Sequence, residues 1–184
     1  MRVILFIIFG AMLGNAAMAY EEAPFFLLKK TSDYEIRKYD TRIAVETAAI
    51  GSNSSFQKLF RYISGNNERS ETIKMTVPVM QSEIDSVRKM LFFLPSSFRK
   101  ATAPLPIEKD VKLVTIPPGY YAVMRYSGFA SDTNFNIHVA KLKAELIKDN
   151  IKIHLPAIKA TYNGPLTPFF IRRNEVMFKV SVDQ

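Results

Sequence analysis

Few side chains in this sequence could do acid–base or metal chemistry near neutral pH. The 184 residues include two histidines, His138 and His154, and no cysteine. A zinc site needs at least three good ligands, and the sequence holds neither an H-x-x-x-H nor a C-x-x-C pair. No serine lies in a G-x-S-x-G elbow. Without cysteine the chain can form neither a disulfide nor a covalent C-x-x-C-H attachment to haem, so its core alone must hold the fold.

Each histidine has two possible roles. His138 falls within a predicted helix, on the flank of its apolar stripe, and His154 directly precedes Leu155-Pro156 in a strand or a connection. Either imidazole could serve as an axial ligand to haem iron. We favour the simpler interpretation for both, a boundary histidine that forms a hydrogen bond or faces water.

Aromatic side chains are the more informative class. Phe56 and Phe60 lie on one edge of a predicted helix that Leu59 and Ile63 suffice to anchor. A proline-containing loop, residues 162–168, ends in Phe169 and Phe170, two rings that are unfavourable to leave in water.

Two interpretations of these rings stay open. Plain core packing explains most aromatic residues of a globular domain. If instead the helix and the loop meet, they form an apolar cleft with cations at its rim, which suits a flat apolar ligand that carries carboxylates.

The hydrophobic pattern predicts the elements that must position these side chains. Alternation with a period of two predicts strands, at residues 34–37, 43–49, 73–79, 90–94, 111–116, 121–126 and 175–182. A period of 3.6 predicts two amphipathic helices, around 56–63 and 135–146. Ser54 or Ser55 is the expected N-cap of the first helix, with Gly65 past its end, and Ser131 or Asp132 is the expected cap of the second.

The order of these elements predicts the fold class. Each half of the chain follows the order strand, strand, helix, strand, joined by an irregular crossing at residues 98–106. Two helices among many strands indicate an α+β fold, whose helices lie on a curved or partly closed antiparallel sheet.

The first nineteen residues have the pattern of an export signal. Arg2 precedes a short apolar run, and Ala17-Met18-Ala19 forms a small-residue cleavage site before Tyr20. The apolar run is shorter than the roughly 20 residues that span a bilayer, so we expect cleavage and no stable membrane insertion. Residues 20–184 would form one domain, periplasmic or secreted, with 24 basic and 17 acidic side chains. This basic excess is scattered and forms no nucleic-acid motif.

Five segments, in order along nearly the whole mature chain, resemble the SOUL haem-binding protein family. They are Tyr34-Glu35-Ile36-Arg37-Lys38-Tyr39, Ile63-Ser64-Gly65-Asn66-Asn67, Ile73-Lys74-Met75-Thr76-Val77-Pro78-Val79, Phe93-Leu94-Pro95, and Tyr162-Asn163-Gly164-Pro165 through Arg172-Arg173-Asn174-Glu175-Val176. The resemblance implies a distorted antiparallel β-barrel with two flanking helices and a pseudo-two-fold duplication. It also implies non-covalent binding of haem or another tetrapyrrole.

The resemblance assigns the pocket to the first helix and to the loop before Arg172. Carried over, Phe56 and Phe60 would cover the ring, Phe169 and Phe170 would lie opposite, and Arg61 would pair with a propionate. This chain has Lys38 where one branch of the family has a histidine that is proposed as an iron ligand. An ammonium group is a poor ligand, so we expect binding without strong iron ligation.

Three functions follow as hypotheses. The leading one is an exported, monomeric carrier, buffer or scavenger of haem or a related porphyrin, without enzymatic activity. The second is a hydrolase or small-molecule sensor that uses the same cleft, in which a glutamate and a tyrosine act as base and orienting group, drawn from Glu46, Glu175, Tyr121 and Tyr162. The third is a protein-interaction domain.

Overall fold

Strands dominate the computed structural model, which describes residues 20–49 and 52–182. Eleven strands are assigned in these ranges, with bounds β1 Glu21–Glu22, β2 Phe26–Lys30, β3 Glu35–Tyr39, β4 Arg42–Ala49, β5 Thr76–Val77, β6 Val79–Ile84, β7 Val87–Phe93, β8 Val111–Ile116, β9 Gly119–Tyr126, β10 Ile153–Thr161 and β11 Asn174–Val180. The helices of the described residues are α1 (Ser52–Ile63), α2 (Asp132–Lys148) and the single 3₁₀ turn η1 (Phe169–Ile171). The predicted export signal, residues 1–19, lies outside the described ranges.

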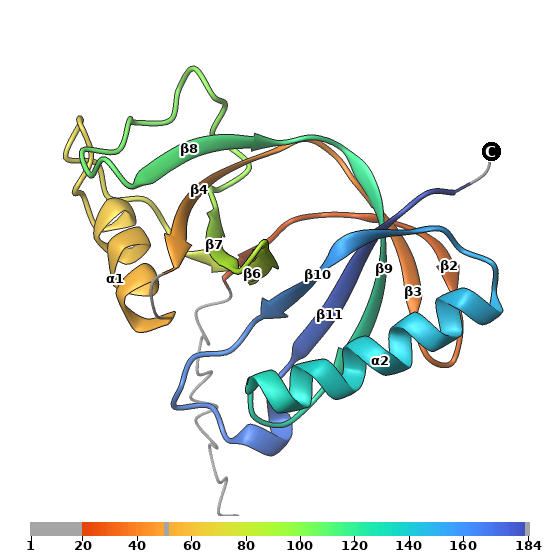
Figure 1. Ribbon diagram of the computed structural model, residues 1–184. Helices are drawn as coiled ribbons and strands as arrows, with labels where there is room; N and C mark the ends of the chain where they lie inside the picture. Colours follow the sequence, from red (N-terminus) through yellow and green to blue (C-terminus); the bar gives the residue numbers. More distant parts are fainter. Residues whose placement is uncertain (1–19, 50–51, 183–184) are drawn as a thin grey trace, which may run out of the picture.

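Nine of the strands form one antiparallel sheet, in the order β2-β3-β9-β11-β10-β6-β7-β4-β8. The sheet curls into a half-barrel, with α1 packed on one half and α2 on the other (Figure 1). The short strands β1 and β5 pair separately and in parallel. The α+β class and the distorted barrel are therefore confirmed, whereas the pseudo-two-fold duplication stays a prediction.

Each helix buries the face that the sequence pattern predicts. In α1 Leu59 and Ile63 are buried against Val45 and Phe92 of β4 and β7. The predicted N-cap is wrong, because α1 begins at Ser52 and both candidate serines lie inside the helix. Gly65 follows α1 with φ of 109°, a backbone conformation that glycine adopts readily.

The second helix covers β9, β10 and β11. Leu142 and Leu146 are fully buried beneath it. Ser131 is its N-cap, as predicted, and the Ser131 side chain accepts a hydrogen bond from the backbone N–H of Asn134. No helix in the described part of the chain is long and apolar enough to cross a membrane.

A third core cluster fills the concave face of the half-barrel. Successive residues of a strand point to opposite faces, and on β9 the side chains of Tyr121 and Val123 belong to this cluster while Ala122 and Met124 face α2. The cluster therefore lies on the face of the sheet away from the helices. The N-terminal segment packs against it through Ala23 and Phe25.

One predicted strand differs from the structure. The alternation at residues 73–79 predicts a strand that Pro78 places at an edge or a bulge, and in the structure only Thr76 and Val77 form β5, while β6 begins at Val79. Pro78 lies between the two strands and follows a cis peptide bond. Because proline has no N–H to donate to the ladder, it interrupts the pairing that the alternation suggests.

Candidate ligand-binding site

Two phenylalanine rings of α1 lie at the surface. Phe56 and Phe60 are 39% and 48% exposed, and their stacked rings have centroids 6.0 Å apart. Phe56 also contacts the buried ring of Phe92 on β7, with centroids 5.1 Å apart. The helix is anchored by Leu59, Tyr62 and Ile63, all buried. Leu59 and Ile63, the anchor that the sequence pattern predicts, are therefore buried, while Phe56 and Phe60 remain partly exposed.

Arg61 of the same helix already has an acidic partner. Its Nε donates to Glu108 Oε1 at 2.8 Å, and its Nη2 donates to Glu108 Oε2 at 3.1 Å. The hydrogen bonds from Arg61 hold the pKa of Glu108 below its ordinary value. Lys58 is paired in the same way with Asp110. A ligand carboxylate at this helix would therefore have to compete with residues 108–110 for both cations.

Phe169 and Phe170 lie in a second exposed aromatic cluster. They form the start of η1 and are 47% and 65% exposed. Phe169 stacks on Phe129 with ring centroids 4.7 Å apart, and Phe170 contacts Phe169 edge-on at 5.6 Å. Sequence analysis missed Phe129, although its position after Gly128 places it in the loop before α2.

Backbone and amide hydrogen bonds hold this second cluster together. The N–H of Gly128 donates to the carbonyl of Phe169, and the Asn174 side chain donates to the carbonyl of Gly128. The Asn134 side chain donates to the carbonyls of Ser127 and Phe129. The loop before α2 and the loop before β11 are thus joined in one surface, so its rings are positioned before any ligand arrives.

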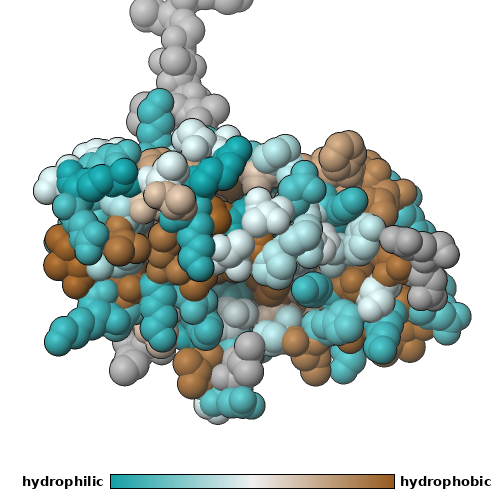
Figure 2. Space-filling view, turned by 90° about the horizontal axis from the view of Figure 1, so that it is seen from above, coloured by the Kyte–Doolittle hydropathy of each residue, from teal (hydrophilic) through white to brown (hydrophobic). Residues whose placement is uncertain are grey.

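The two aromatic surfaces are built separately. Among the described residues, ring contacts link Phe56 with Phe60, and Phe129 with Phe169 and Phe170, and no ring contact joins the two groups. Figure 1 shows α1 and η1 as distinct elements that project from different strands. Figure 2 shows hydrophobic surface at the end of the molecule that carries α1, interrupted by hydrophilic side chains. That the two groups face one another across one cleft stays a prediction.

The histidines occupy positions typical of boundary residues. His138 is half-buried, donates through Nδ1 to the carbonyl of Asn134 at 2.8 Å, and stacks on Tyr126 with centroids 4.1 Å apart. His154 is exposed and contacts Ser181 Oγ through Nε2. In residues 20–49 and 52–182 no three metal-binding side chains of histidine, cysteine, aspartate or glutamate come together. Lys38 is exposed on β3.

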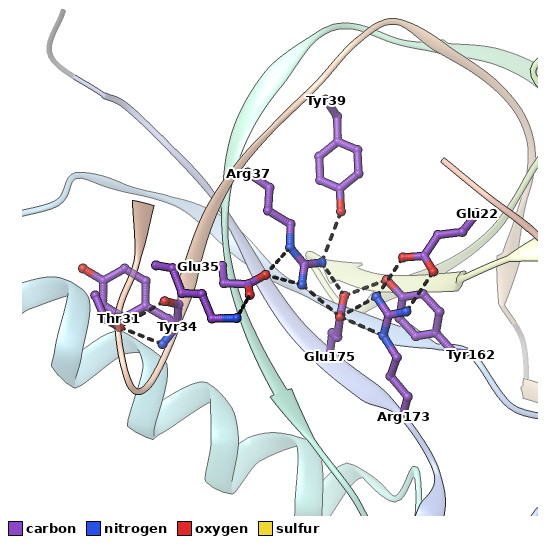
Figure 3. Close-up of polar contacts among 10 residues, drawn as sticks. Glu22, Thr31, Tyr34, Glu35, Arg37, Tyr39, Tyr162, Arg173 and Glu175 are labelled. Carbon is purple, nitrogen blue, oxygen red and sulfur yellow. Dashed lines mark hydrogen bonds and ion pairs between the residues drawn. The ribbon is translucent and has the colours of Figure 1, made fainter. Parts of the chain in front are cut away.

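A charged network lies on the concave face (Figure 3). Glu175 is fully buried, and its two carboxylate oxygens accept hydrogen bonds from Arg37 at 3.0 and 3.2 Å, from Arg173 at 2.9 and 3.1 Å, and from the Tyr162 hydroxyl at 2.6 Å. Burial, followed by the negative charge of Glu175, raises the pKa of Tyr162. The glutamate and tyrosine considered for acid–base work do meet here.

The network is nevertheless closed to a substrate. Both oxygens of Glu175 are engaged by internal donors, so no lone pair is free to take a proton from a bound molecule. Of the other candidates, Glu46 is paired with Lys89, and Tyr121 is buried against Tyr39. The N-terminal segment completes the network, because both carboxylate oxygens of Glu22 accept hydrogen bonds from Arg173 at 2.7 and 2.8 Å.

Comparison with known proteins gives one family. The profile of the family described as SOUL heme-binding protein matches residues 20–179. Heme-binding protein 1 of Xenopus laevis is 28% identical over 159 residues, which cover 79% of this chain and 82% of the relative. Heme-binding protein 2 of Homo sapiens is 28% identical, over 91% of this chain and 89% of the relative.

Solved structures share the fold at low identity. The C-terminal domain of EcmrR has a TM-score of 0.61 and 12% identity, with 80% of this chain and 96% of that domain covered. A protein described as a hydrolase from Listeria innocua has a TM-score of 0.58 and 12% identity, with 81% and 92% covered. At this identity the similarity shows the architecture alone.

Proposed function

Because the chain belongs to the SOUL haem-binding protein family, we propose that it binds haem or a related tetrapyrrole reversibly and acts as a carrier, buffer or scavenger. The observation that carries the proposal is the pair of exposed, stacked rings of Phe56 and Phe60 on α1. Rings of this size are unfavourable in water unless a ligand covers them.

The residues present suit such a ligand. A tetrapyrrole is flat and apolar and carries acidic side chains, and α1 offers two stacked rings on one edge and two cations, Lys58 and Arg61, elsewhere around the same helix. We propose that Phe56 and Phe60 cover the ring, that the surface of Phe169 and Phe170 contributes to an apolar cleft, and that Arg61 exchanges Glu108 for a propionate. Haem would supply an iron centre, and the chain's own residues would hold the ring and shield it from water.

The proposal is tested by titrating the protein with haemin and following the Soret band. We expect saturable binding, and we expect Phe60→Ser to weaken it about tenfold, the loss that follows from removing roughly 1.5 kcal/mol of apolar contact. Since Phe60 is half-exposed, the variant should keep the melting temperature of the parent protein.

The matched control is Phe26→Ser. Phe26 is 70% exposed on the edge strand β2, at the end of the molecule away from α1 (Figure 1). We expect this change to leave haemin affinity unaltered. Equal weakening by both variants would mean that haemin binds exposed phenylalanines without a defined site, and the absence of a saturable spectral change would remove the proposal.

We also propose that the protein works as a monomer outside the cytoplasm. Cleavage before Tyr20 would leave β1, which starts at Glu21, intact. Amino-terminal sequencing of the exported protein tests the cleavage site, and light scattering tests the oligomeric state. A mature chain that starts elsewhere than Tyr20 would contradict the first statement, and a dimer mass the second.

The family and the closed Glu175 network favour a binding protein over a hydrolase. The specific support for a binding protein is that Glu175, the candidate base, is buried. Both of its carboxylate oxygens already accept hydrogen bonds from Arg37, Arg173 and Tyr162. A panel of small esters tests the alternative. Turnover that depends on Tyr162, lost in Tyr162→Phe with the fold retained, would support an enzyme instead.

A further inference from the structure

Arg42, the first residue of β4, has a buried guanidinium without an anionic partner. Within the described ranges no carboxylate forms an ion pair with it, and its Nε and Nη1 atoms are buried with no hydrogen-bond acceptor. Its neighbours Arg37 and Arg173 differ, because both are paired with Glu175. Burial lowers the pKa of Arg42, opposed in part by Tyr121, Tyr39 and Tyr162. Arginine nevertheless stays protonated in proteins, so a buried positive charge remains.

Two aromatic rings contact this cation, but they accept no hydrogen bond from its Nε or Nη1. The Arg42 Cζ atom lies 4.4 Å from the ring centroid of Tyr39 and 3.9 Å from that of Phe93. Such contacts stabilise the charge through the faces of the rings. The N–H groups of a guanidinium point outward in its own plane, and they need oxygen acceptors that the rings cannot provide.

The same arginine lines a cavity. The cavity has a volume of about 610 Å³ and lies where the turn after β3, the loop after β7 and the N-terminal segment meet. Its walls beside Arg42 are mostly apolar, formed by Ile43, Phe93, Leu94, Pro95 and Phe98. A volume of this size, with apolar walls and a few charged or polar groups, is typical of small-molecule sites.

We propose that this cavity binds a small apolar carboxylate whose head group pairs with Arg42. A carboxylate on the ligand would balance the buried charge of Arg42, and an apolar body would cover the walls. Glu21 and Asp40 also line the cavity and are exposed at its rim, which disfavours ligands that carry further negative charge. Neither Phe56, Phe60, Phe169 nor Phe170 lines it, so the site is separate from the proposed tetrapyrrole surface and does not depend on that proposal.

The test uses 2-naphthoate and its neutral analogue 2-naphthamide on the unaltered protein. Isothermal titration should show saturable binding of the carboxylate and at least tenfold weaker binding of the amide, because the amide has the same shape without the charge. Equal binding of the two ligands, or none of either, would overturn the proposal, and this comparison needs no variant that might fail to fold.

A pair of arginine variants then locates the site. Arg42→Met keeps the apolar stem and removes the charge, so naphthoate affinity should fall at least tenfold while the melting temperature stays the same or rises, as removal of an unpaired buried charge predicts. Arg125→Met is the control, because Arg125 is exposed on β9 and does not line this cavity. It should change naphthoate affinity by less than threefold.

The outcomes also separate this site from the tetrapyrrole surface. Naphthoate should bind equally well to the Phe60→Ser variant and to protein saturated with haemin. Full retention of naphthoate binding in Arg42→Met would overturn the assignment of the head group. Displacement of naphthoate by haemin would place both ligands in one site and overturn the proposal of a separate one.

Discussion

The carboxylate of Glu175 is fully buried, and three side chains replace the hydration that it loses. Arg37 and Arg173 each donate two hydrogen bonds to it, and Tyr162 donates one. A buried ion is tolerated only when its partners replace the hydration that it loses. The network therefore depends on a negative charge at position 175 and not merely on a polar side chain.

Removal of the negative charge of Glu175 should destabilise the folded protein. We expect Glu175→Gln to lower the free energy of unfolding by about 3–5 kcal/mol, because the buried Arg37 and the partly buried Arg173 lose a shared counter-charge. Urea denaturation at pH 7 measures this. Glu35→Gln is the control, since Glu35 pairs with Arg37 at the partly exposed end of the network, and its loss should be below about 1 kcal/mol. Equal effects of the two changes would show that the central charge is not required.

Some residues of the candidate site could be predicted from the sequence, and others could not. The helical wheel placed Phe56 and Phe60 beside the buried stripe, because the wheel depends only on local geometry. The sequence could not predict that Arg42 has no ion-pair partner. The environment of Arg42 depends on Tyr39 and Phe93, which come from other strands of the folded sheet, and on the fact that no carboxylate of the described residues forms an ion pair with Arg42.

At the scale of elements, α2 is tied to the sheet by an ion pair at its start. Asp132 accepts a hydrogen bond from the buried Lys159 of β10 at 2.9 Å and pairs with Arg88 of β7 at 3.1 Å. The Lys159 hydrogen bond is the main cause that lowers the pKa of Asp132 below its ordinary value of 3.8. A carboxylate at the first turn also interacts favourably with the helix dipole.

This pair predicts a dependence of stability on pH. Because the pKa of Asp132 is lower in the folded protein than in the unfolded chain, its stabilisation is present above the ordinary aspartate pKa and is lost as the pH falls through the folded value. Asp132 is half-exposed, so we expect Asp132→Asn to cost only about 1 kcal/mol at pH 7. Urea denaturation should find a smaller difference at pH 2 than at pH 7, because protonation of the Asp132 carboxylate weakens its ion pairs.

The control for Asp132 is Asp33→Asn. Asp33 is exposed, and its carboxylate accepts a hydrogen bond only from the neighbouring Ser32 hydroxyl among the described contacts. It should alter stability by less than about 0.5 kcal/mol at either pH. A cost for Asp132→Asn that persists unchanged at pH 2 would mean that the effect does not arise from its ionisation.

The elements themselves were predictable to different degrees. The strands β4, β8 and β9 and both helices follow clear periodicities, so their positions agree with the sequence pattern within a few residues. The edge strand β2 was missed, because its sequence Phe-Leu-Leu-Lys-Lys does not alternate and all five side chains are exposed. Pairing with β3, and not the burial of one face, defines this strand.

For the whole molecule, the N-terminal segment covers part of the concave face of the half-barrel and packs against its core. Phe25 lies over the concave face, with its ring centroid 5.5 Å from that of Tyr39 and 4.4 Å from the Arg37 Cζ atom. The parallel pairing of β1 with β5 and the pair between Glu22 and Arg173 fix the same segment. A half-barrel that exposed this face would leave three tyrosines and two methionines of the third core cluster uncovered.

Two neighbouring phenylalanines test the importance of this segment. Phe25→Ser should lower the free energy of unfolding by roughly 2–3 kcal/mol, because a ring that packs on the concave core is replaced by a small polar group. Phe26→Ser, one residue later on the exposed edge, should change it by less than about 0.5 kcal/mol. Thermal melts of the two variants give the comparison, and similar losses would show that the segment does not contribute to the core.

The attachment of residues 21–25 across the mouth of the half-barrel decides where foreign sequence can be joined to the protein. A purification tag or a fused fluorescent protein placed just before Glu21 would lie beside the β1–β5 pair and the Glu22–Arg173 ion pair, and its bulk would disturb both. At the other end β11 finishes at Val180, and the following Val182 is already exposed. Fusions and surface immobilisation are therefore best made through the carboxyl end, where neither proposed binding site is disturbed.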